Sequence, residues 1–275
     1  MTAYFGISRQ AYYKAEKRME KKALSEQAAL ELVRKIRRRQ PQLGGKKLYY
    51  LISEELHQLP VKIGRDAFFK ILRSNSLLVR KKRRQYSTTY SKHNKQVYPN
   101  LIKELEVTKP NQVLVSDITY IKRKASFSYL SVVSDLYSRK ILGYHVCNNL
   151  SLEGPLTALK NCLKDIPRTS QAKMIHHSDR GIQYSSHHYT QKLKQNQIKV
   201  SMSAKGNPYD NAVMERIMGI LKQEFFLNKT YPDSVSIKKA VKEAITIYNE
   251  ERPHLSLAYK TPDEVYNEKS YGQVA

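Results

Sequence analysis

The chain has 275 residues, enough for a catalytic domain with a buried core and a smaller second domain. Lysine and arginine number 49 against 24 aspartate and glutamate, a net charge of +25 that favours a polyanionic partner, most often nucleic acid. The sequence argues against a membrane protein and a disulfide-rich or zinc-binding one, because no apolar run nears the roughly 20 residues of a membrane span and the two cysteines are isolated.

The positive charge is concentrated in the first third of the chain. Residues 1–98 hold 24 lysines and arginines against 7 acids, whereas the remaining 177 residues hold 25 against 17. The opening residues, MTAYFGISRQ, lack a signal-peptide pattern. We therefore expect a cytoplasmic, nucleoid-associated protein that binds DNA mainly through its first third and has no membrane partner.

The first 80 residues are predicted to be helical. A short helix is expected at 4–22, a longer one from Ser25 to Arg39, and two more around 48–56 and 68–72. Glycine and proline residues separate the last three helices. Such helices fit a helix-turn-helix-like DNA-binding domain, and a small helical bundle with solvated cations is the alternative. The outward cations suited to phosphate contacts are Arg65, Lys70 and Arg73.

The start of the chain allows two interpretations. The stretch GISRQAYYKAEKR resembles the second helix of a helix-turn-helix whose first helix is missing. This chain would then begin partway through a longer fusion. The alternative is an amphipathic tail that frays.

A basic linker is expected at 81–110. It opens with a run of five cations, a pattern that is usually disordered until it meets a polyanion, and tyrosines are interleaved in the residues that follow. This linker could lie along DNA by charge and occasional stacking, or it could only speed association. The cations of the run are Arg80, Lys81, Lys82, Arg83 and Arg84.

Residues 111–275 change to the pattern of an α/β domain. Short β-branched and apolar runs predict strands, and longer amphipathic stretches predict helices between them. The expected order is strands at 112–121, 127–134 and 139–147, a helix at 152–165, a strand at 172–178, a helix at 186–196 and a strand at 198–202. Further helices are expected around Glu215 and at 235–250.

Three acids in this domain have a spacing that suits phosphodiester chemistry. Asp117 interrupts the apolar run VLVSDITYI, Asp179 ends a predicted strand, and Glu215 lies in the second turn of a predicted helix. Two divalent ions about 3.5–4 Å apart can activate an oxygen nucleophile and neutralise the phosphate, and Mg²⁺ needs only a few carboxylates. Taken singly, Asp179 is more often a turn residue and Glu215 a solvated helix residue, so the combination carries the prediction.

Four motifs resemble one known family. They are VLVSDITYI, HSDRGIQY, GNPYDNAVMERIMGILKQE and YNEERPHLSLAYKTPDEVY, and thirty-five residues separate Asp179 from Glu215. Together they resemble the DDE transposases of bacterial insertion sequences, of the second-frame (OrfB) type with a retroviral-integrase-like core. Leu114 and Tyr209 stand where related chains often carry Trp, a departure that bears on side-chain packing more than on chemistry.

The resemblance implies a fold, a metal site and partners. The fold would be α/β, a ribonuclease-H-like mixed sheet flanked by helices, with the fourth strand beside the first. Asp117, Asp179 and Glu215 would be the catalytic and metal-binding triad, holding two Mg²⁺ ions for which Mn²⁺ substitutes. Partners would be element-end and target DNA, further copies of the chain in a DNA synapse, and an upstream-frame protein or fusion. Asp135 is also family-like, but its place at a hairpin predicts turn hydrogen bonds instead.

Several further residues are expected near the DNA or the acids. Lys222 follows Glu215 by seven residues and so lies on the same helix face, and the loop before that helix offers Lys205, Tyr209 and Asn211 for DNA contacts. A supporting or substrate-positioning role is expected for His177, which lies two residues before Asp179. The resemblance implies such a role, or a DNA contact, for Arg252 and His254, where the sequence alone predicts a helix end followed by a loop.

The predicted function is that of a transposase that binds element ends, cuts DNA and transfers the freed 3′-hydroxyl to another strand. A tyrosine recombinase is the enzymatic alternative, since the chain has 20 tyrosines, although no tyrosine stands out as a nucleophile. A DNA-binding regulator with an inactive catalytic domain is the non-enzymatic alternative, and the presence of all three acids argues against it.

Overall fold

The computed structural model describes residues 8–79, 97–204 and 211–268. The chain divides into two compact units, Met1–Arg83 and Arg84–Ala275. Each unit has its own apolar core, and each is described by itself below.

The first unit is a small all-helical domain. Its helices are α1 (Arg9–Arg39), α2 (Gly45–Gln58) and α3 (Arg65–Ser74). The C-terminal half of α1 packs with α2 and α3 around a core that includes Val33, Leu48 and Phe68. Side chains before Ser25 are exposed, so the N-terminal half of α1 makes no contribution to that core.

Helix α1 is continuous where two helices were predicted. Ser25 was expected to start a second helix, but its hydroxyl donates to the Lys21 carbonyl 3.0 Å away, one turn earlier in the same helix. The same oxygen accepts a hydrogen bond from the backbone N–H of Val61 at 3.0 Å. A buried serine thus joins the helix to the α2–α3 connection, and it does not act as a cap.

The second unit is built on a five-stranded mixed sheet. Its strands are β1 (Val113–Lys122), β2 (Phe127–Asp135), β3 (Ile141–Cys147), β4 (Ile175–Ser178) and β5 (Lys199–Met202), in the order β3-β2-β1-β4-β5. The first three strands form an antiparallel meander, whereas β4 and β5 run parallel to β1. The predicted ribonuclease-H-like sheet, with the fourth strand beside the first, is confirmed.

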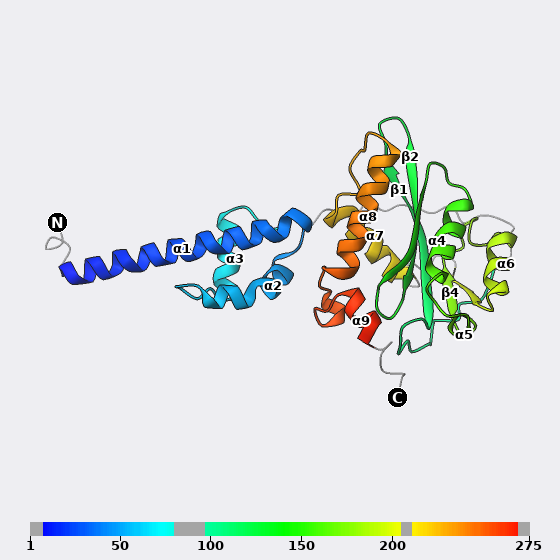
Figure 1. Ribbon diagram of the computed structural model, residues 1–275, viewed down its shortest axis with the longest axis horizontal. Coiled ribbons are helices and arrows are strands. Elements are labelled where there is room, and N and C mark those ends of the chain that lie inside the picture. Colours follow the sequence, from blue (N-terminus) through cyan, green and yellow to red (C-terminus); the bar gives the residue numbers. More distant parts are fainter. Residues whose placement is uncertain (1–7, 80–96, 205–210, 269–275) are drawn as a thin grey trace. The chain divides into compact units, whose positions relative to one another are not determined.

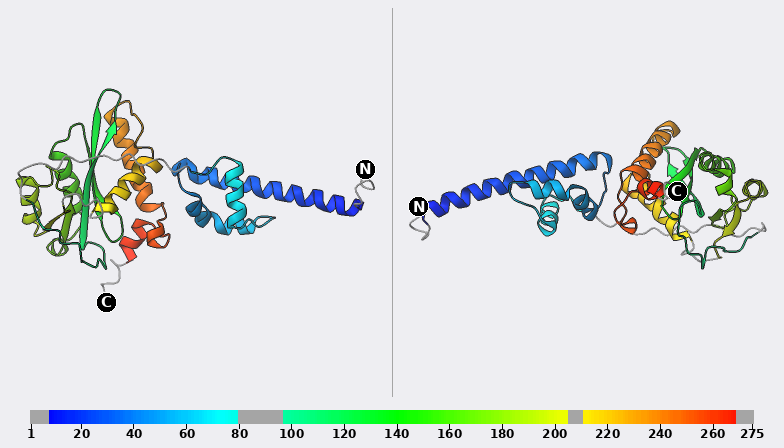
Figure 2. Two further views of the ribbon diagram at one scale, coloured as in Figure 1. Left: turned by 180° about the vertical axis from the view of Figure 1, so that it is seen from behind. Right: turned by 60° about the horizontal axis from the view of Figure 1, so that its bottom comes forward.

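Helices cover both faces of this sheet (Figures 1 and 2). One face packs against α7 (Ala212–Glu224) and α8 (Ser234–Glu250), and the other against α4 (Glu153–Leu163) and α6 (His187–Gln195). Gly143 allows α4 to approach β3 closely, because a Cβ there would lie 2.2 Å from the Ala158 carbonyl. The remaining elements are α5 (Arg168–Gln171), the 3-10 turn η3 (Leu255–Leu257) and α9 (Pro262–Glu268).

The hairpin between β2 and β3 is held by Asp135 and by the C-terminal helices. The buried Asp135 carboxylate accepts hydrogen bonds from the backbone of Asn111 and from both the N–H and the hydroxyl of Ser138, at 2.7–2.8 Å. The Asn249 amide of α8 exchanges two hydrogen bonds of 2.9 Å with the backbone of Ile141. Asp135 is therefore a turn-stabilising residue, as the sequence predicted.

The described part of the predicted linker lies against the second unit. Ile102, Leu105 and Val107 pack on the core that α7 and α8 share with the sheet. The backbone N–H of Leu101 donates to the Ser201 hydroxyl at 2.9 Å. Within the described ranges, no helix is both long and apolar enough to cross a membrane.

Candidate active site

Two of the predicted acids lie side by side on neighbouring strands. In the parallel pair of β1 and β4, Ser116 stands opposite Ser178. Asp117 and Asp179 are the residues directly after this last pair. The register of the two strands therefore places their backbones next to each other. From Asp117 to Ile121 β1 pairs with β2 alone among the described strands, which leaves its other edge open beside the Asp179 turn; at the end of β1, the Tyr231 N–H donates to the Lys122 carbonyl at 2.9 Å.

The Asp117 carboxyl lies in negative surroundings. Its pKa is raised to about 7, mainly by burial and then by the charge of Asp179, with a smaller contribution from Glu215. A hydrogen bond from the Ile118 N–H at 2.8 Å and the charge of Lys222 act in the opposite direction. The charges of the other two predicted acids therefore both act on the Asp117 carboxyl.

The turn after β4 fixes the Asp179 side chain. The Gly181 N–H donates to Asp179 Oδ1 at 2.9 Å, and a Cβ at Gly181 would lie 2.9 Å from that same oxygen. Arg180 donates from Nε to the Ser203 carbonyl at 2.8 Å, which ties the turn to the end of β5. Glycine at 181 therefore keeps the carboxylate uncrowded on that side.

Helix α7 presents Glu215 and Lys222 beside β1. The apolar side chains of α7, among them Met214, Ile217 and Leu221, are buried against the sheet, and Glu215 in the first turn is exposed. The Lys222 ammonium lies 4.3 Å from the centre of the Tyr120 ring, and burial lowers its pKa while the charge of Asp117 raises it. Lys222 thus faces β1 near Asp117, which agrees with the shared helix face predicted for it.

The donor set suits a hard divalent cation. Asp117, Asp179 and Glu215 offer only carboxylate oxygens, the ligands that Mg²⁺ prefers. Their mutual repulsion raises the Asp117 pKa, and a bound cation would relieve that repulsion. In the part of the chain that the structure describes, no three acidic, histidine or cysteine side chains already lie close enough to enclose an ion. The acids fit such a metal without forming a closed cage.

The raised pKa of Asp117 predicts a pH-dependent gain in stability for the variant Asp117→Asn. Between an ordinary pKa of 3.8 and the folded value of about 7, the unfolded chain loses this proton while the folded chain keeps it, so wild-type stability falls with rising pH. Asn avoids this loss, which is at most about 4 kcal/mol and, after solvent screening, about 1–3 kcal/mol.

Chemical denaturation in EDTA from pH 5 to pH 8 measures this effect. The stability advantage of Asp117→Asn should grow up to about pH 7 and then level off. Glu243→Gln, at an exposed position of α8 in the same unit, controls for the loss of one negative charge. If the stability advantage of Asp117→Asn were the same at every pH, the fold would not disfavour the ionised form of Asp117.

The three residues expected to support the site contact other parts of the fold. His177 is buried and bonds the hydroxyls of Ser201 at 2.8 Å and Ser203 at 3.2 Å, which links β4 to β5. Arg252 donates two hydrogen bonds of 2.8 Å to Glu224, the last residue of α7. His254 packs edge-to-face on Tyr248, with ring centroids 4.9 Å apart. Any effect of theirs on the acids passes through β4, α7 and α8.

The predicted DNA contacts are only partly described. Arg65, Lys70 and Arg73 are exposed on α3, with Arg65 also 3.2 Å from Asp66. Asn211 is the N-cap residue of α7, but its side chain makes no capping hydrogen bond. The other predicted contacts lie outside the described residues: Arg80, Lys81, Lys82, Arg83, Arg84, Lys205 and Tyr209.

Two tyrosines near the acids were given no role from the sequence. Tyr120 lies under the Lys222 ammonium. The pKa of Tyr184 is raised by burial first, then by Tyr189, and then by the charges of Asp117 and Asp179. The Tyr184 hydroxyl has no hydrogen-bond partner among the described residues. Only the motifs SDITY and DRGIQY, which place each tyrosine three and five residues after an acid, could have indicated them.

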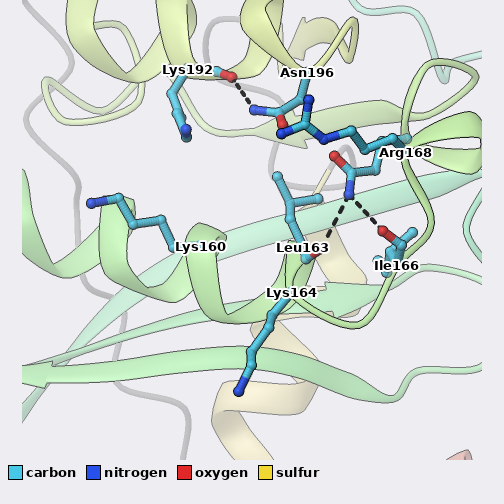
Figure 3. A pocket seen from close by; sticks show the side chains of 8 residues that line it. Lys160, Leu163, Lys164, Ile166, Arg168, Lys192 and Asn196 are labelled. Carbon is cyan, nitrogen blue, oxygen red and sulfur yellow. Dashed lines mark hydrogen bonds between the residues drawn. The ribbon is translucent and has the colours of Figure 1, made fainter.

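A separate hollow of about 310 Å³ contains none of these residues (Figure 3). It lies among the C-terminal ends of α4 and α6 and helix α5, and cations make up half of its lining residues. Helix C-termini favour cations because of the helix dipole, which accounts for Lys160 and Lys192 there. Its lining residues are Lys160, Leu163, Lys164, Ile166, Arg168, Gln171, Lys192 and Asn196.

Comparison with known proteins identifies the domain that holds the acids. An integrase core domain family matches residues 107–208, and a second integrase core domain family matches residues 196–262. The first range includes Asp117 and Asp179, and the second includes Glu215.

Curated relatives resemble the chain over most or all of its length. An uncharacterized 31 kDa protein of insertion element IS600 from Shigella sonnei is 34% identical, with all of both chains covered. The transposase for insertion sequence element IS904 from Lactococcus lactis is 34% identical over 78% of this chain and 86% of its own length.

Among solved structures, similar chains come from retroviral integrases. The simian T-cell lymphotropic virus intasome in complex with PP2A regulatory subunit B56 gamma matches at 19% identity and a TM-score of 0.48, with 82% of this chain and 70% of that chain covered. The HTLV-2 integrase catalytic core in complex with magnesium matches at 17% identity and a TM-score of 0.44, with 57% and 97% covered.

Proposed function

This chain belongs to the insertion-sequence transposases with an integrase core domain, and on that premise we propose which residues carry out its reaction. The enzyme is a polynucleotidyl transferase of the DDE type that cuts DNA and transfers the cut strand to another DNA. Asp117, Asp179 and Glu215 form the proposed catalytic triad. The observation that carries this assignment is that Asp117 in β1 and Asp179, directly after β4, follow the last paired residues of two adjacent parallel strands, and that Glu215 is within electrostatic reach of Asp117.

The reaction depends on divalent metal ions, and we propose that the triad holds two Mg²⁺ ions, with Mn²⁺ able to substitute. When bound, such ions would neutralise the phosphate and lower the pKa of an attacking hydroxyl or water. The protein's own contribution is to hold the carboxylates at the open edge of β1, with Gly181 and Ile118 donating backbone hydrogen bonds to two of them. These bonds orient the carboxylates before the substrate arrives.

We propose that binding of element ends is divided between the two units. The exposed cations of α3 would contact backbone phosphates, which explains the charge surplus in the first third of the chain. The basic run at 80–84 would add contacts along the DNA, and Lys205, Tyr209 and Asn211 before α7 would add contacts of their own. We also propose assembly of several copies in a DNA synapse on the nucleoid, and cooperation with an upstream-frame protein or fused segment.

Lys222 is proposed to hold a phosphate next to the one at the acids. It lies seven residues after Glu215, about 10.5 Å further along α7 on nearly the same face. Lys222→Ala is expected to weaken binding of an element end by about 1–3 kcal/mol, the size of one lost contact, and Lys222→Arg should restore part of it. End-joining rates across DNA concentrations measure this, with Lys239→Ala, an exposed lysine of α8, as the control. Wild-type rates for Lys222→Ala at limiting DNA would remove Lys222 from the site.

Joining of a labelled element end to target DNA tests the proposed function as a whole. Products should form with Mg²⁺ and be absent in EDTA.

A further inference from the structure

Two aromatic side chains form an exposed ledge beside the candidate site. Tyr120 and Phe127 lie near the tip of the β1–β2 hairpin, with ring centroids 5.4 Å apart and planes at 85°. Their exposed fractions are 47% and 41%. Among the described residues of the second unit, no other tyrosine or phenylalanine side chain is exposed to this degree. We call this pair the Tyr120–Phe127 ledge.

Two adjoining aromatic side chains are seldom left exposed to solvent. Tyrosine and phenylalanine side chains contribute large apolar areas to a core, yet these two are exposed to solvent and in contact with each other. A single exposed apolar residue needs no explanation, whereas an adjoining pair next to a cation and an acid is typical of a binding site. The ledge therefore has the character of a surface that a ligand covers.

The neighbours of the ledge indicate which ligand. The Lys222 ammonium lies 4.3 Å from the centre of the Tyr120 ring and within the influence of Asp117. An aromatic face next to a cation is the combination with which proteins hold unpaired nucleotides, because the ring stacks on the base while the cation meets the phosphate. A protein surface could also cover two rings, but it would not require the lysine and the acid beside them.

The distance along the strand fits a nucleotide near the reacting phosphate. Tyr120 follows Asp117 by three residues, which corresponds to about 10 Å in a β-strand. Consecutive base pairs of DNA rise by about 3.4 Å, so about 10 Å corresponds to at most three nucleotides and to fewer where bases are unstacked. Side chains three positions apart in a strand point to opposite faces of the sheet, so the DNA strand would reach the ledge around the edge of β1, where Lys222 lies near both Asp117 and Tyr120.

We propose that the Tyr120–Phe127 ledge is a nucleobase-binding site that stacks an unpaired base one to three nucleotides from the phosphate held at the acids. This proposal rests on the proposed function, since it takes the acids as the place of the reacting phosphate. The stacked base stabilises a frayed DNA end in the geometry that the reaction needs. It also leaves Lys222 free to turn from the ring toward a phosphate.

The test is a binding cycle between the ring and the base. Element-end duplexes carry an abasic site at the first, second or third nucleotide from the reactive phosphate, and fluorescence anisotropy in EDTA reports affinity for the full chain. At one of these positions the wild type should lose about 5- to 100-fold in affinity. On intact DNA, Tyr120→Ala should have an affinity lower than that of the wild type by the same factor. The abasic site should lower the affinity of Tyr120→Ala by less than about two-fold more. Tyr120→Phe should behave as the wild type does.

Two controls separate stacking from other roles of the ring. Tyr50→Ala removes an equally exposed tyrosine from the first unit and should retain full sensitivity to the abasic site. Lys222→Ala should retain it as well, because the base contacts the ring and not the ammonium. As a second readout, 2-aminopurine at the sensitive position should lose fluorescence with the wild type and not with Tyr120→Ala.

Equal abasic penalties for the wild type and Tyr120→Ala at all three positions would overturn the proposal. So would a Tyr120→Ala effect that disappears in a Lys222→Ala background, because the ring would then act only by holding the lysine. Cleavage of the same duplexes by the wild type in Mg²⁺ is measured in parallel. If the wild type cleaves the DNA but the abasic site affects it and Tyr120→Ala equally, only the base-binding role of the ledge is refuted. If the wild type does not cleave the DNA, the proposed function is refuted, and the binding measurements still decide whether the ledge binds a base.

Discussion

Replacing any one of the three acids, by Asp117→Asn, Asp179→Asn or Glu215→Gln, is expected to abolish strand cleavage and strand transfer while DNA binding persists. Each amide keeps the size of the side chain but removes the charge that a divalent cation needs. Loss of one ligand from such a site should lower the rate by at least about 1000-fold, or about 4 kcal/mol of transition-state stabilisation.

Paired activity and gel-shift measurements test the three acids separately. Asp135→Asn serves as a control acid of the same sheet, because its carboxylate holds the β2–β3 turn and has no proposed contact with substrate. It should lower thermal stability yet leave activity at low temperature within about ten-fold of the wild type, given that a hydrogen-bonded turn is weakened and not removed. More than about a tenth of wild-type activity in a triad variant would remove that residue from the triad.

Arg252→Met should strongly destabilise the second unit. The Arg252 side chain is 1% exposed and donates two hydrogen bonds of 2.8 Å to the Glu224 carboxylate at the end of α7. Removing one partner of a buried ion pair leaves the other charge without compensation and costs about 3–5 kcal/mol. For a unit of this size that corresponds to a fall in melting temperature of about 10 °C.

The double variant Arg252→Met/Glu224→Met distinguishes pairing from simple loss of packing. If the unpaired carboxylate causes the loss, the double variant should recover at least half of it, because no buried charge remains. Glu215 lies two and a half turns before Glu224 on the same helix. At low temperature, where the unit stays folded, Arg252→Met should therefore keep most of its activity. A double variant no more stable than Arg252→Met would show that the arginine acts through its bulk.

The strands of the sheet and the positions of the three candidate acids were predictable from local patterns. Apolar runs with β-branched residues mark β1, β2 and β3, and the interruption of the β1 run by Asp117 is visible in the letters themselves. The parallel pairing of β1 with β4, which brings Asp179 to Asp117, came from the resemblance to the integrase-like transposases. Periodicity alone does not specify which strands pair.

Contacts between distant residues could not be predicted in this way. Arg252 and Glu224 are 28 positions apart, and nothing in their neighbourhoods marks one as the partner of the other. A helix was expected to begin at Ser25, yet this serine lies inside a continuous helix and accepts a hydrogen bond from Val61, 36 positions away. Tyr120 is likewise one of 20 tyrosines until α7 places Lys222 over its ring.

The most direct test of the central claim is one gel that follows a labelled element end incubated with the full chain and target DNA. With Mg²⁺ the wild type should join the end to the target, and EDTA or Asp117→Asn should prevent joining. After denaturation no protein should remain attached to the labelled strand, because the hydroxyl attacks the phosphate directly. Joining in EDTA, or a covalent adduct between a tyrosine and the DNA, would contradict the account and indicate recombinase chemistry in its place.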